Sequence, residues 1–138
     1  MPLDPELVRT RCQEITDSVA RLQRIGVEPL ERFLADADLQ DIACYRLQIA
    51  IEAALALCYH VAARRLRIVP EDYAACFRAL AVHGLLPGDL AERLQRMARL
   101  RNLLVHMYWK VDYRMIRDII QRHLGDLAQF VDLIVDLG

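Results

Sequence analysis

Residues 39–66 read LQDIACYRLQIAIEAALALCYHVAARRL, and this stretch decides the fold. Alanine, leucine and isoleucine dominate it, neither proline nor glycine interrupts it, and apolar residues recur at steps of three and four. That spacing gathers apolar side chains on one face of an α-helix. We therefore predict one long core helix from Leu39 to Leu66, whose apolar face carries Ile42, Tyr45, Ile49, Ala53, Ala56, Tyr59 and Ala63.

The residues before this stretch also have helical patterns, and no sustained alternation of period two indicates a strand. Asp4 and Pro5 predict the start of a first helix, because aspartate caps helices and proline fits the first helical turn. This helix is expected to end near Gly26. A short second helix is expected to start at Pro29 and to run toward Leu34.

Three further helices are predicted after the long one. They are expected over Pro70-Glu71-Asp72 to Gly84, over Asp89 to about Tyr108, and from a cap at Asp112 to about Asp136. In the last helix His123 fills a gap in the apolar seam, as a core or interface residue, between Ile116, Ile120, Leu127, Phe130, Ile134 and Leu137. The chain is therefore predicted to be all-α: a single domain over residues 1–138, with four main helices and short extra ones in an up-and-down bundle.

The composition excludes several classes of protein. With 55% apolar and 27% charged residues over 138 positions, the chain is expected to bury a sizeable core rather than to be disordered. No apolar run is expected to span a bilayer and no signal-peptide pattern is present, so we expect a cytoplasmic protein without a membrane partner. A net charge of −1 means that any binding of nucleic acid must come from a local patch. The cysteines have no metal-ligand spacing and are interpreted as buried thiols: Cys12, Cys44, Cys58 and Cys76.

The predicted helix from Asp89 carries polar residues beside an apolar seam. The seam positions are Leu90, Leu94, Met97, Arg101, Leu104 and Tyr108, so an arginine occupies a position that faces the core. A buried guanidinium is costly without a partner, so Arg101 is expected to be paired, to reach the edge of the bundle or to line a polar cleft. Asn102 and His106 lie one turn apart on the adjacent stripe. This cluster favours a site, and a plain polar contact between helices is the alternative.

Helix geometry limits how these groups can meet. On an ideal helix Arg101 and His106 are about 140° apart. They come together only if the arginine side chain curls round, if the helix ends early, or if a second subunit completes the site. Glu52, inside the apolar stretch of the long helix, either supports this site or forms a surface ion pair. Three arginines spaced three apart offer either a basic row for RNA or a solvated face: Arg93, Arg96 and Arg99.

The segment from Arg101 to Tyr108, RNLLVHMY, matches the R-x4-H-x-Y motif of the HEPN superfamily, and its flanks resemble the HepT toxins of HEPN/MNT pairs. Residues 45–53 (YRLQIAIEA) and 70–73 (PEDY) also resemble segments of that family, so the resemblance runs from about Leu39 to the C-terminus. Two departures occur, because Arg99-Leu100 stands where many relatives have glycine and an aromatic residue, and Met107 stands where an acidic residue is common. Neither removes a catalytic group.

The resemblance implies a toxin endoribonuclease that cleaves RNA without a metal or other cofactor. The ribose 2′-hydroxyl would attack the adjacent phosphate, with His106 as general base or acid and Arg101 holding the phosphate. Asn102 and Tyr108 would support and orient these groups. One histidine cannot easily act on both sides of phosphorus, and the family's dimers imply a homodimer in which two copies of the motif form a composite site.

The resemblance also implies a partner, a small nucleotidyltransferase of the MNT type that acts as antitoxin. In some family members this partner adds AMP to a tyrosine of the motif, which here is Tyr108. A tyrosine packed in the helix seam is the alternative interpretation of Tyr108. For the whole chain, the alternative is a catalytically silent module that binds the nucleotidyltransferase without cutting RNA, and a bundle that binds a small ligand is a weaker third.

Overall fold

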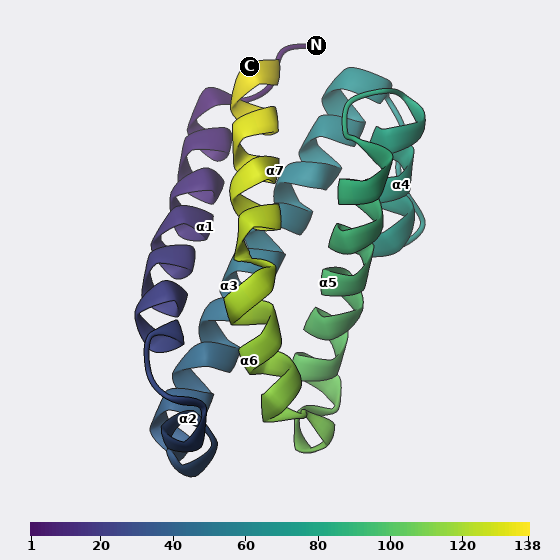
Figure 1. Cartoon of the computed structure of the whole chain (residues 1–138). Coiled ribbons are helices and arrows are strands. Elements are labelled where there is room, and N and C mark those ends of the chain that lie inside the picture. The colour runs from purple at the N-terminus through teal and green to yellow at the C-terminus, as the bar shows by residue number, and fades with distance from the viewer.

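A computed structural model describes residues 1–138, and its regular elements are all helices (Figure 1). In chain order they are α1 (Pro5–Gly26), α2 (Leu30–Ala35), α3 (Ala37–Val61), α4 (Tyr73–Val82), α5 (Gly88–His106), α6 (Tyr113–Arg122) and α7 (Leu124–Leu137). A π-helical turn, Ala62–Leu66, extends α3, and a 3-10 turn, Tyr108–Lys110, follows α5. The long members of the bundle are α1, α3, α5 and the α6–α7 pair, and both chain ends lie at one end of it. The prediction of an all-α bundle is confirmed.

Aspartates start most of the helices, as several of the predictions required. The carboxylate of Asp4 accepts the backbone N–H of Glu6 at 3.0 Å, and that of Asp112 accepts the N–H of Arg114 at 2.9 Å. These bonds satisfy N–H groups that have no partner inside the helix. Asp36 caps α3 in the same way, so α3 begins two residues before the predicted Leu39.

The predicted opening of α4 was wrong by one turn. Residues 70–72 lie outside the helix, and Asp72 in extended conformation accepts the N–H of Ala75 at 2.7 Å as its cap. The predicted end is confirmed, because Gly84 has a φ of 76° and the N–H of Leu85 bonds the carbonyl of Leu80 at 2.8 Å. A positive φ is open to glycine at little cost, which is why the helix closes there.

The helix α3 lies at the centre of the bundle and packs against α1, α4, α5, α6 and α7. Its buried face is not the predicted stripe, since Ile42 and Tyr45 are 48% and 56% exposed. The buried positions include instead Ala43, Leu47, Ala50, Ala54, Leu57 and Val61. Because α3 is apolar nearly all round, the spacing of its apolar residues does not identify one buried face. Other helices pack closely where the small alanine side chains allow it.

The predicted last helix is two helices, α6 and α7, with the break at His123. His123 has φ −122° and ψ 1°, although its N–H still bonds the carbonyl of Ile119 at 2.8 Å. Gly125 weakens the helix just after this point, since glycine costs a helix about 1 kcal/mol relative to alanine. The predicted apolar seam nevertheless holds across the break, because its members are buried at Ile116, Ile120, Leu127, Phe130 and Ile134.

Together α3 and its π-helical turn span 30 residues, Ala37–Leu66, with a window of mean hydropathy 1.4. By length and composition alone this helix could cross a membrane, which differs from the expectation that no run is long enough. Half of that window is buried inside the bundle. The central helix of a soluble protein passes the same test, because the core that surrounds it selects the same residues.

The four cysteines are free thiols, as predicted. Cys12, Cys58 and Cys76 are buried, and Cys44 is partly buried. Burial and the nearby Asp41 carboxylate raise the pKa of Cys44 to about 11, so its thiol stays protonated at neutral pH. Burial also raises the pKa of Cys12 and Cys58, so neither these two thiols nor Cys44 is an activated nucleophile.

Candidate active site

The motif residues lie at the C-terminal end of α5, which stops at His106 rather than at the predicted Tyr108. Met107 leaves the helical conformation, with φ −141° and ψ 43°, while its N–H still bonds the carbonyl of Leu103 at 2.9 Å. An early end of the helix was one of the arrangements that could bring the motif together. Because α5 ends at His106, Arg101 and Asn102 lie inside the helix, whereas Tyr108 lies in the turn that follows it.

Arg101 faces α3 and is held there. Its Nε donates to Oε1 of Glu52 at 3.1 Å, and only 18% of its side chain is exposed. The same Oε1 accepts the amide of Gln48 at 3.2 Å, and the guanidinium lies 5.5 Å from the centre of the Tyr73 ring. Arg101 is thus paired, as its seam position required, and Glu52 forms an ion pair across two helices rather than with neighbours on its own helix.

Asn102 contacts Arg101 and lines a polar hollow. The Oδ1 of Asn102 accepts from a terminal nitrogen of Arg101 at 3.2 Å. A hollow of about 490 Å³ opens here between α4 and α5, and Tyr73, Arg99 and Asn102 are among its lining residues. The outer nitrogens of Arg101 keep N–H donors beyond the one that Asn102 accepts, but the carboxylates of Glu71 and Asp72 also line the hollow.

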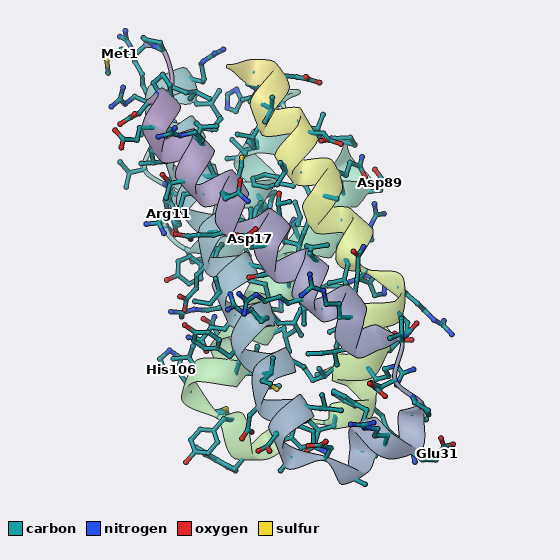
Figure 2. The ribbon with its side chains drawn as sticks, turned by 90° about the vertical axis from the view of Figure 1, so that its left-hand side faces the viewer. Met1, Arg11, Asp17, Glu31, Asp89 and His106 are labelled. Atoms are coloured by element: carbon teal, nitrogen blue, oxygen red, sulfur yellow. The ribbon has the colours of Figure 1, made fainter.

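His106 is the last residue of α5 and is exposed to solvent (Figure 2). Asp89 marks the other end of the same helix in that view. No hydrogen bond or ion pair joins His106 to Arg101, whose partners are Glu52 and Asn102. Within one chain, the side chains of Arg101 and His106 therefore make no direct polar contact.

Tyr108 and Trp109 lie in the 3-10 turn and are 69% and 66% exposed. Their rings meet edge to face with centroids 5.5 Å apart. The interpretation of Tyr108 as a residue packed in the α5 seam is therefore wrong, because the helix ends before reaching it. Its hydroxyl projects from a short turn beside a hollow of about 210 Å³ that Tyr45 also lines.

The three arginines of the predicted basic row differ in their partners. Arg93 lies 2.9 Å from Asp126 of α7 and 3.4 Å from Asp89, so it joins two helices. Arg96 has only Glu92, at 3.7 Å and well exposed, while Arg99 forms no ion pair. Arg93 is thus held in ion pairs that join helices, whereas Arg96 has one long contact and Arg99 has no acidic partner.

His123, at the break between α6 and α7, lies 3.5 Å from Oδ2 of the buried Asp126. Its side chain is 39% exposed, so of the two predicted alternatives, a core or an interface residue, the core residue is wrong. No group of three or more metal-ligating side chains occurs around it or elsewhere in the chain.

Two residues that contact the site had no assigned role in the sequence analysis. Gln48 and Tyr73 both reach the Glu52–Arg101 pair, one through an amide and one through its ring. Gln48 lies one turn before Glu52 on α3, and this i, i+4 spacing was the available signal. Tyr73 comes from α4, and no local pattern connects it with a residue on α5.

Comparison with known families identifies the chain. The model of the family described as "Ribonuclease HepT-like" matches residues 15–134. The chain belongs to the HepT-like ribonuclease family. The HEPN resemblance of the motif and its flanks is thereby confirmed.

Two proteins from Shewanella oneidensis and a further toxin–antitoxin structure are similar to nearly the whole chain. The relative named mRNA nuclease HepT is 27% identical over 129 residues, which is 94% of this chain and 96% of the relative. A solved structure of the tri-AMPylated HEPN toxin in complex with the MNT antitoxin has a TM-score of 0.89 and 26% identity, and the match covers 96% of this chain and 99% of that one. A toxin–antitoxin structure with AMP-PNP has a TM-score of 0.85 and 26% identity, covering 95% and 99%.

A more distant structure shows only the shared fold. The cytosolic protein YutE from Bacillus subtilis, of unknown function, has a TM-score of 0.75 at 14% identity, and the match covers 93% of this chain and 88% of that one. The HepT-like bundle therefore persists where little sequence is shared.

Proposed function

We propose that this HepT-like chain is a toxin that cleaves RNA, mRNA among its substrates, at a site built from Arg101, Asn102, His106 and Tyr108. One observation carries the assignment: Glu52 fixes Arg101 through Nε, with Asn102 beside it and a free histidine at the end of the same helix. A guanidinium fixed in this way has donors left for a phosphate, and an exposed imidazole is free to exchange protons.

The proposed reaction is an internal transfer that needs no metal ion. The ribose 2′-hydroxyl loses its proton to a histidine and attacks phosphorus, and the bond from phosphorus to the 5′-oxygen breaks. The leaving oxygen takes a proton, so the products are a 2′,3′-cyclic phosphate and a 5′-hydroxyl end. His106 acts as base or acid, Arg101 stabilises the charge on the phosphate oxygens, and Asn102 and Tyr108 orient the substrate.

A homodimer completes this site in our proposal. A proton is removed on one side of phosphorus and delivered on the other, which two copies of His106 provide more easily than one. The apolar residues Ile42 and Tyr45 of α3 are exposed, and so are Tyr108 and Trp109 of the neighbouring turn. Tyr45 and Tyr108 line one hollow, so this exposed apolar surface is continuous with the motif. Large exposed aromatic residues at one place favour a protein interface.

An MNT-type nucleotidyltransferase is the proposed antitoxin, and Tyr108 is the proposed acceptor of AMP. The solved relative is a tri-AMPylated HEPN toxin in complex with an MNT antitoxin. Tyr108 is 69% exposed, so its hydroxyl is open to a modifying enzyme. Nucleotides attached there would add negative charge beside the phosphate site and exclude RNA. We further propose that residues 1–138 act as one HEPN domain and that the protein works in the cytoplasm.

Cleavage by the purified protein tests the nuclease proposal. Labelled RNA is incubated with the wild type and with His106→Ala, and the new ends are analysed for a 2′,3′-cyclic phosphate. We expect cleavage by the wild type and loss of at least about a hundredfold in the variant, the usual share of general acid–base catalysis. Equal RNA turnover by both proteins would refute the role of His106.

The alternative of a catalytically silent module makes a different prediction in the same experiment. A silent module binds the nucleotidyltransferase, but the wild type neither cleaves RNA nor arrests growth when expressed alone. The two outcomes separate the proposals, because binding of the antitoxin is expected under both.

Mass spectrometry after coexpression with the MNT partner tests the modification. We expect added AMP on the peptide that contains Tyr108 and none in Tyr108→Phe. Tyr45 is a matched control, since it is exposed on the same surface but lies outside the motif. An unmodified Tyr108 in a fully neutralised complex would contradict the proposal.

A further inference from the structure

A groove runs along α5 on the side that faces α6 and α7. We call it the α5 groove, and it has a volume of about 490 Å³. Pockets of roughly 300 to 1,000 Å³ accommodate small ligands. It is distinct from the polar hollow at Asn102, although Arg99 lines both.

The floor of the α5 groove is apolar. Met97 and Leu100 from α5 are 5% and 6% exposed, and Leu103 and Ile119 are half-buried beside them. Met115, at the start of α6, is 38% exposed and stands at the mouth. Such a surface favours the flat face of a base or another apolar group over water.

The rim of the groove carries positive charge that the chain does not balance. Arg93 is neutralised by Asp126 and Asp89, but Arg96 has only a long contact with the exposed Glu92, and Arg99 has no acidic partner. Free arginines beside an apolar floor match a ligand that combines phosphates with bases. Two copies of the groove packed face to face would bring like charges together, which disfavours this face as a contact between subunits.

The groove also leads to the proposed catalytic histidine. Arg99 and His106 are seven residues apart, so on an ideal helix they lie within about 20° of each other and roughly 10.5 Å apart along the axis. Leu103 lies between them on the same face, and Arg96 continues the row away from His106. Arg99 is therefore aligned with His106, whereas Arg101 is not.

We propose that the α5 groove binds the single-stranded RNA next to the bond that is cut. Arg96 and Arg99 contact its phosphates, and one base lies on the floor formed by Met97, Leu100, Leu103 and Ile119. This inference rests on the proposed nuclease function and adds the route of the substrate. The floor is aliphatic, so the contact tolerates different bases.

Binding measurements in an inactive background test the groove. Fluorescence anisotropy of a labelled 12-nucleotide RNA is measured with His106→Ala protein, alone and with either Arg99→Gln or Met115→Trp. Arg99→Gln should weaken binding about fivefold and reduce the salt slope by about 1, since one phosphate contact is lost. Met115→Trp fills the groove mouth from an exposed position and should weaken binding with the salt slope unchanged.

Arg21→Gln is the matched control, because Arg21 is exposed on α1, which has no substantial contact with α5. It should bind RNA as the parent does, and circular dichroism checks that all variants fold. With His106 intact, Arg99→Gln and Met115→Trp should raise KM for RNA and leave kcat close to the wild-type value.

Three results would overturn the inference. The first is unchanged RNA binding and KM in both groove variants of a protein that cleaves RNA. The second is a change in the oligomeric state of the groove variants while RNA binding stays intact. The third is a loss of antitoxin binding while RNA binding stays intact. Either of these two results would make the groove a protein interface. A wild type that cleaves no RNA refutes the proposed nuclease, and the anisotropy series still decides whether the groove binds RNA.

Discussion

Arg101 lies on the face of α5 that packs against α3, so its guanidinium needs a partner as soon as the helices meet. Glu52 provides it, and the acceptor is shared with Gln48. The arrangement makes Glu52 a positioning residue in our proposal, since it acts on RNA only through Arg101. The contribution of an ion pair to stability decreases when water reaches it, and 37% of the Glu52 side chain is exposed. The pair therefore matters more for the position of Arg101 than for the stability of the fold.

Glu52→Gln tests this role. The amide keeps an acceptor for Arg101 but loses the charge, so we expect kcat to fall about tenfold with a smaller change in KM. The control is Glu14→Gln, which removes an ion pair with Arg11 on α1, 3.1 Å long and away from the site. A tenfold loss in both variants, or in neither, would contradict a positioning role for Glu52.

Ser18 is a buried residue whose replacement should help the fold. Its side chain is fully buried and its hydroxyl has no hydrogen-bond partner. Ser18→Ala should therefore raise the free energy of unfolding by up to about 1 kcal/mol, measured by urea denaturation. Thr16→Ala is the comparison, because the Thr16 hydroxyl bonds the carbonyl of Cys12 at 2.9 Å and its loss should bring no gain. Destabilisation by Ser18→Ala would mean that the hydroxyl is satisfied.

At the scale of elements, the helix starts were the most predictable part of the sequence. Asp4 and Asp112 carry a local signal, because the cap and the N–H groups that it satisfies are within three residues. The break at His123 was not predictable from spacing, since the apolar seam continues across it in phase. The buried face of α3 depends on which helices pack around it, and that information is not local.

Two glycines at helix ends should respond oppositely to alanine. A Cβ at Gly125 in α7 meets nothing within 4 Å, so Gly125→Ala should stabilise the protein by roughly 0.5 to 1 kcal/mol. A Cβ at Gly26 would lie 3.0 Å from Ile120 and 3.3 Å from Gln121, so Gly26→Ala should destabilise it. Thermal midpoints measure both, and shifts of the same sign would contradict the packing at the α1–α6 contact.

The N-terminal segment is joined to α3 by a histidine. Nε2 of His60 accepts the backbone N–H of Asp4 at 2.9 Å, and burial together with the nearby Arg64 lowers the pKa of His60 below its ordinary value of 6.5. The unfolded chain therefore binds more protons below about pH 6.5, and stability should fall as the pH decreases from there. Thermal midpoints from pH 7.5 to 5 should show a shallower decline in His60→Gln than in the wild type. His83→Gln, at an exposed position, should follow the wild type.

At the scale of the whole molecule, one chain brings Arg101 and His106 into no direct polar contact. The sequence limited how they could meet, because they are about 140° apart on a helix, and it left a curled arginine, an early helix end and a second subunit as alternatives. It did not predict how Arg101 is held, since Glu52 and Tyr73 are brought to α5 by tertiary packing. It also did not predict the exposed surface at Tyr45 and Trp109, because Tyr45 was assigned to the core face of a helical pattern and Trp109 lies beyond the predicted helix.

Mixing the wild type with an inactive variant tests the composite site. His106→Ala is expected to be inactive, and a mixed dimer of one wild-type and one His106→Ala chain should be inactive as well, because the proposed site needs both copies of His106. In an equal mixture that exchanges subunits, only the dimers with two wild-type chains, about a quarter of the total, should then cleave RNA. Native mass spectrometry verifies that mixed dimers form. Mixed dimers that keep about half of the wild-type activity would place all groups of a working site in one chain.

The contact between Arg101 and Glu52 joins positions that are 49 residues apart. If expression of the chain arrests growth, cells that escape by inactivating it need not alter the motif at all. Survivors of such a selection should carry substitutions at position 52 as well as in the motif, in protein that still accumulates to normal levels. The positions of the escape mutations would thus show genetically that Glu52 holds Arg101 in place.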